Sequence, residues 1–279
     1  MTLARRFHPA RAAAAAFFVA AALLAPRAHA HDSWLSPARE PAPLSHVALE
    51  LATGSHYPLQ EFSQSVASVA RSGCVAASGA TVALNPTRVP PHWLDLDAAM
   101  PDRTDAAVSC WVELHTAEVD IEPRIVQVYF RDIHASAAIR DAWSELQSRN
   151  LPWHERYRKF ARIELASADT LDARALAAAR RPVGLDLEIV VLGDRPIAVG
   201  EPLRVQVLRD GRPLAGLPVE LVSERSPLGV WRETDAEGEL AQRLPFGGRW
   251  LLRATDLRQS QDAPETWASR FVTLAIDVR

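Results

Sequence analysis

The strongest constraint on the fold is a series of short alternating segments that fills residues 182–279. Leu203, Val205 and Val207, for example, alternate with polar residues. This alternation is typical of β-strands that bury one face. Short strands at regular spacing predict an immunoglobulin-like β-sandwich over residues 182–279. The region contains no cysteine, which excludes the inter-sheet disulfide of antibody domains.

Turn signals separate these expected strands. Asp210-Gly211 is a strong hairpin signal, because both residue types tolerate a positive φ. Residues 234–238 predict a second tight turn between apolar segments.

The region before residue 135 also has a β pattern. Residues 109–115 alternate cleanly, with Cys110, Val112 and Leu114 on one expected face. Residues 125–130 are rich in β-branched and aromatic side chains and predict another strand. We therefore expect an N-terminal β domain over residues 31–134.

Between the two β regions the period changes to that of a helix. Residues 136–148 place Ile139, Trp143 and Leu146 on one helical face, and Ser136 is a suitable N-cap. We expect residues 153–162 to be a charged, exposed helix, and residues 170–181 another helix. The predicted fold is mainly β, with two β-sandwich-like domains joined by a short helical segment over residues 135–181.

The first 30 residues have the three parts of a secretory signal peptide. A basic stretch precedes an apolar run over residues 12–24, and Ala28-His29-Ala30 ends in a small-x-small cleavage pattern. The alternative is a membrane anchor, but a spanning helix needs about 20 apolar residues. We expect Sec-type export to the periplasm and a mature chain that begins at His31 and does not span the membrane.

The net charge and the cysteine content reduce the number of possible functions. A formal net charge of -3 without a basic block gives no support for nucleic-acid binding. Cys74 and Cys110 are the two cysteines, and in an exported chain such a pair is more often a disulfide than a metal site.

An N-terminal histidine favours metal chemistry. The α-amine, with a pKa of about 7.7–8.0, is partly deprotonated at neutral pH. His31 could thus offer its amine and imidazole to one ion, nickel or cobalt, or copper as the alternative. Asp32 could ligate the ion or orient the imidazole.

The sequence does not identify which second histidine would bind the ion. His56 lies in a predicted loop and is the first candidate, followed by His134. The other histidines have simpler interpretations, as surface or solvated side chains; they are His46, His92, His115 and His154.

Several stretches resemble an exported family with a domain of unknown function, related to the periplasmic accessory component of nickel/cobalt uptake systems (NikM/NikK-like). The stretches are residues 31–37, 153–162, 211–216, 234–238, 248–252 and 267–269. The resemblance implies a two-part, β-rich periplasmic protein that handles a transition metal, with a permease or an outer-membrane receptor as partner.

Three functions follow as hypotheses. The preferred one is non-enzymatic binding or delivery of nickel or cobalt. The second is a copper protein or a copper mono-oxygenase-like enzyme that uses the N-terminal histidine. The third is an adhesion or scaffold module without a metal, since a sandwich fold does not fix a function. The sequence has no nucleotide-binding glycine loop, no Ser-His-Asp signature and no H-E-x-x-H zinc motif.

Overall fold

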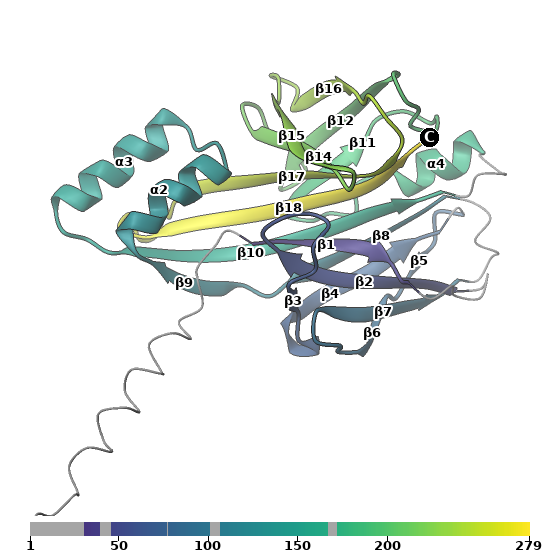
Figure 1. The fold of residues 1–279 in the computed structure, drawn as a ribbon, viewed down its shortest axis with the longest axis horizontal. Helices are drawn as coiled ribbons and strands as arrows, with labels where there is room; N and C mark the ends of the chain where they lie inside the picture. The colour runs from purple at the N-terminus through teal and green to yellow at the C-terminus, as the bar shows by residue number, and fades with distance from the viewer. Residues whose placement is uncertain (1–30, 40–45, 77, 101–106, 167–171) are drawn as a thin grey trace, which may run out of the picture.

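The computed structural model describes residues 31–39, 46–76, 78–100, 107–166 and 172–279. The expected signal peptide, residues 1–30, lies outside the described residues. The described strands form three sheets and confirm that the protein is mainly β. Figure 1 shows the three sheets as layers, with the largest in the middle.

The central sheet combines strands from both ends of the chain. Its order is β15-β14-β17-β18-β10-β8-β4-β5, and β9 continues the line of β8 along β10. Its strands are β4 (Val69–Val75), β5 (Thr81–Val82), β8 (Val108–Leu114), β9 (Ala117–Ile121), β10 (Trp153–Leu165), β14 (Pro218–Ser223), β15 (Ser226–Glu233), β17 (Gly248–Gln259) and β18 (Trp267–Val278).

A smaller sheet on each side covers part of the central sheet. The first has the order β1-β2-β7-β6 with β3 beside β2; its strands are β1 (Asp32–Pro37), β2 (His46–Gly54), β3 (Phe62–Ser63), β6 (Asn85–Arg88) and β7 (Trp93–Ala99). The second contains β11 (Leu187–Val191), β12 (Pro202–Arg209), β13 (Arg212–Pro213) and β16 (Glu239–Arg243).

Where the two smaller sheets cover it, the central sheet is buried on both faces, and each covered face builds its own core. In β18, Leu274 packs with the β11–β12 sheet, while its neighbour Ala275 packs with the β1–β2 sheet. Side chains alternate between the faces of a strand, so a strand between two layers is apolar on both sides. This explains why residues 271–276 form a nearly continuous apolar run.

Three α-helices and one 3₁₀ turn complete the described chain: α2 (Pro123–Asp132), α3 (Ala137–Ser148), α4 (Ala173–Ala179) and η2 (Val66–Ser68). Helices α2 and α3 pack over one end of the long strands (Figure 1). Trp143, Trp153 and Trp267 belong to one buried cluster there. No helix among the described residues is long and apolar enough to cross a membrane.

Two sequence predictions of local structure are wrong. The charged segment 153–162 is not a helix but the first part of β10, which pairs with β18 in parallel and with β8 and β9 antiparallel. Its charges are tolerated because they pair with carboxylates of neighbouring strands and of the next sheet; Arg162, for example, donates to Glu188 of β11 in the adjoining sheet. Thus the middle segment, residues 135–181, contains a central strand of the largest sheet.

The second wrong prediction is the strand at residues 125–130, which belongs to helix α2. Pro123 opens this helix, and Val126, Tyr129 and Phe130 are buried along one side of it. These positions have helical spacing, and their packing against the sheet overrides the β-propensity of the segment.

Other local predictions are confirmed. Ser136 is the N-cap of α3, where its hydroxyl accepts a hydrogen bond from the Ile139 amide. Asp210 and Gly211 form the two-residue hairpin loop between β12 and β13, with φ values of 51° and 73°.

Candidate functional site

His31 lies directly before β1 and is held from three sides. Its ring meets the Phe62 ring edge-on at 5.1 Å, and its Nε2 atom is 3.8 Å from Glu61 Oε2. Its backbone carbonyl accepts a hydrogen bond of 2.6 Å from Lys159 Nζ. With its side chain only 17% exposed, the histidine is fixed at the surface rather than extended into solvent.

The strand pairing explains how Glu61 comes to lie beside His31. Asp32 of β1 pairs with Gly54 at the end of β2. The loop then folds back tightly, and the Glu61 amide donates to the Thr53 carbonyl. A Cβ atom at Gly54 would lie 2.4 Å from the Leu59 carbonyl oxygen, so this close return of the loop requires glycine.

Asp32 has a structural partner. Its side chain is buried, and its carboxylate pairs with Arg253 of β17 at 2.6 Å. Burial lowers the pKa of Arg253, but Asp32 and Glu220 more than offset this effect and hold that pKa above its ordinary value. For Asp32 to bind a metal directly, it would have to give up this ion pair and leave the half-buried Arg253 with Glu220 as its partner.

Lys159 is the second group that anchors the start of β1. Burial lowers its pKa to about 8, although Asp32 and Glu155 act in the opposite direction. Its ammonium group also lies over the Tyr157 and Phe271 rings. The first residues of β1 are thus tied to strands of the central sheet by charge and by hydrogen bonds.

Glu155 is a buried carboxylate in the same region. It accepts hydrogen bonds from Tyr129 Oη, Trp153 Nε1 and Ser269 Oγ. Burial raises its pKa, and the three donors partly counter this. Because these donors occupy the carboxylate, its role here is to join α2, β10 and β18.

The other two predicted metal ligands have different surroundings. His56 is exposed in the loop after β2. His134 lies between α2 and α3, where its ring stacks on Trp231 with a centroid distance of 3.7 Å. Within the described part of the chain, no group of three or more His, Cys, Asp or Glu side chains is arranged to hold a metal ion.

The cysteine pair joins two strands. Cys74 of β4 and Cys110 of β8 are register partners, both are fully buried, and they form a disulfide. The bond lies inside the core between the central sheet and the β1–β2 sheet, so it has a structural position.

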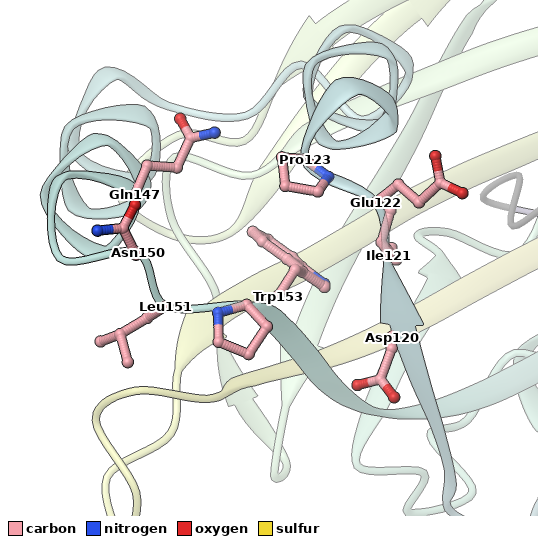
Figure 2. A pocket seen from close by; sticks show the side chains of 9 residues that line it. Asp120, Ile121, Glu122, Pro123, Gln147, Asn150, Leu151 and Trp153 are labelled. Carbon is pink, nitrogen blue, oxygen red and sulfur yellow. The ribbon is translucent and has the colours of Figure 1, made fainter.

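A pocket of about 490 Å³ lies elsewhere, between the end of β9, the start of α2 and the end of α3 (Figure 2). Ile121, Pro123 and Leu151 give it an apolar wall, and Asp120 and Glu122 lie at one side. None of the predicted metal ligands lines this pocket.

Sequence reasoning missed Glu61, Lys159 and Arg253. Each acts on the start of β1 from a distant part of the chain, and Arg253 is 221 residues away from Asp32. An ordinary carboxylate, lysine or arginine within a strand or loop carries no local signal of such a contact.

The fold and the site define a mainly β protein with a tethered N-terminal strand and a histidine at its start. Residues 28–256 match the model of a family described as a domain of unknown function (DUF4198). The chain belongs to this family. No curated protein matches the chain.

Proposed function

We propose that this is a non-enzymatic, exported protein that binds a transition-metal ion, nickel or cobalt, and delivers it to an uptake system. The observation that carries the proposal is the placement of His31, whose carbonyl is bound by Lys159 and whose ring lies beside Glu61. A histidine placed in this way loses little conformational freedom when it binds an ion, which favours affinity.

The chemistry assumes export and cleavage after Ala30. Cleavage there would give His31 a free α-amine, and this amine and Nδ1 could bind one ion in a chelate ring. The Glu61 carboxylate is on the Nε2 side of the ring, 3.8 Å from that atom. A carboxylate on the far nitrogen orients a metal-bound imidazole and makes it a stronger ligand. Nickel and cobalt accept such nitrogen ligands, and water can fill the other positions.

We also propose that the family is related to the accessory component of nickel/cobalt uptake systems, which would make a permease or an outer-membrane receptor the partner. We further propose that residues 182–279 form an immunoglobulin-like half of a two-part, sandwich-like protein.

Calorimetric titration of protein that begins at His31 tests the proposal, with nickel, cobalt, copper and zinc as ligands. We expect His31→Ala, and a variant with one glycine before His31, to weaken nickel or cobalt binding at least tenfold. The added glycine keeps the imidazole but removes the chelating amine. His56→Ala is the matched control and should bind as the unchanged protein does.

Two results would refute the proposal: binding no tighter than millimolar by the processed chain, or tight binding that survives His31→Ala. Preference for copper together with peroxide turnover on polysaccharides would instead support the copper enzyme.

A further inference from the structure

We propose a separate metal site on the outer face of β9 and β10, where His154 Nε2 and the Glu118 carboxylate bind one divalent ion of the zinc or copper type. Asp120 orients the imidazole. The site uses no residue of the proposed His31 site and goes beyond that function.

Strand pairing brings the three side chains together. β9 and β10 are antiparallel, with His154 opposite Asp120 and Arg156 opposite Glu118. The three side chains therefore project from the same face of the sheet. Glu155, the next residue in β10, points to the opposite face, where it meets Tyr129 of α2.

The two ring nitrogens of His154 have different surroundings. Nδ1 is 2.8 Å from Asp120 Oδ1, and Nε2 is 3.8 Å from Glu118 Oε2. When Nδ1 donates its proton to Asp120, the neutral ring has its lone pair on Nε2, which faces Glu118. This is the arrangement of a carboxylate–histidine–metal unit, with a second carboxylate where the ion would bind.

The spacing suits an ion between the two groups. Bonds of about 2.0–2.2 Å to nitrogen and oxygen, at a tetrahedral angle, place the two ligand atoms about 3.4 Å apart. The observed 3.8 Å needs only a small rotation of Glu118, whose side chain is 58% exposed. Water can supply the remaining ligands, because the His154 side chain is itself 37% exposed.

One neighbour competes with the ion. Arg156 Nε lies 3.3 Å from Glu118 Oε1, and both side chains are more than half exposed. Exposed ion pairs of this kind are weak and screened by salt, so a metal ion can displace the guanidinium.

His46 offers a matched control. Its Nδ1 is 3.0 Å from Asp97 Oδ2, and its side chain is 39% exposed, close to the value for His154. Among the described residues no carboxylate lies within 4.0 Å of its Nε2. Each histidine thus has its own carboxylate at Nδ1, but only His154 has a second carboxylate near Nε2.

The test is a titration of the processed chain with zinc chloride, in which nitrogen NMR of the histidine rings is recorded at each zinc concentration. We expect the Nε2 signal of His154 to shift at lower zinc concentration than that of His46. His154→Ala should remove one bound zinc, and Glu118→Gln and Asp120→Asn should each weaken this site at least tenfold. His46→Ala should leave it unchanged.

The proposal is overturned if His154→Ala binds as much zinc as the unchanged protein, or if Glu118→Gln has no effect. It also fails if zinc shifts the His46 and His154 rings equally, since His154 would then be a histidine that only pairs with two carboxylates. His31→Ala separates the two proposals, because it should weaken nickel or cobalt binding at least tenfold and leave the His154 site intact.

Discussion

Arg162 and Glu188 show how single residues hold the layers of this molecule together. Their side chains are 3% and 1% exposed, and they join β10 to β11 across two sheets. Removing one member of such a pair leaves a buried charge without a partner, which costs about 3–5 kcal/mol. We therefore expect Arg162→Met to lower the free energy of unfolding by that amount in urea titrations.

The control for this prediction is an exposed pair of the same chemistry. Arg204 pairs with Glu239 at the surface, with side chains 60% and 27% exposed. Arg204→Met should cost less than about 1 kcal/mol, because exposed pairs contribute little. Equal costs for the two substitutions would contradict the structural role given to the buried pair.

Lys159 predicts a pH dependence of stability. Burial lowers its pKa to about 8, whereas the unfolded chain should have the ordinary value of about 10.4. Between these values the unfolded state binds more protons, so the free energy of unfolding rises with pH. Compared with Lys159→Met, the unchanged protein should gain stability from pH 8 to pH 10.

Urea unfolding of both proteins at several pH values checks this sign. The difference between them isolates Lys159, because the other titrating groups are common to both chains. A difference that stays flat or falls across that range would mean that Lys159 is not charged and buried as described.

At the scale of elements, the disulfide fixes β4 against β8. Cys74 and Cys110 are separated by 36 positions, and closing a loop of that length stabilises the fold by about 4 kcal/mol in the chain-entropy model. Reduction should lower the urea midpoint accordingly. The double variant Cys74→Ala/Cys110→Ala is the control, and its midpoint should not respond to reductant. The prediction is contradicted if reductant leaves the midpoint of the disulfide-bonded protein where it was.

Elements whose signals are local could be predicted from the sequence. Helix α3 was predictable because its cap and its apolar face lie within 13 residues, and the β12–β13 hairpin because Asp210-Gly211 alone specifies the loop. β10 was not, because its neighbours β8 and β18 are distant in the chain. The charges at residues 153–162 suggest an exposed helix, because carboxylates that pair with them, such as Glu188, lie elsewhere in the chain.

At the scale of the whole molecule, the central sheet joins both halves of the sequence. β18 pairs with β10 over nine register positions, from Glu155–Trp267 to Ile163–Ala275. A fragment of residues 182–279 would expose this long edge of β18, and an unpaired edge promotes aggregation. We expect the fragment not to fold alone, as measured by proton NMR dispersion and by proteolysis. A soluble fragment with cooperative unfolding would contradict this expectation.

The candidate site shows the same limit of sequence reasoning. His31 could be singled out from its place after the expected cleavage pattern, but its neighbours could not. Glu61 reaches it through a loop that folds back on β2, and Lys159 reaches it from the centre of another sheet. His56 and His134 stay predictions by residue type; in the structure the first is exposed and the second stacks on Trp231.

X-ray absorption at the nickel edge of the processed, nickel-loaded protein tests whether His31 is a metal ligand. We expect a shell of nitrogen and oxygen ligands with the outer scattering of an imidazole, and its loss in His31→Ala. A spectrum of the fully hydrated ion, or one that is identical in His31→Ala, would contradict it.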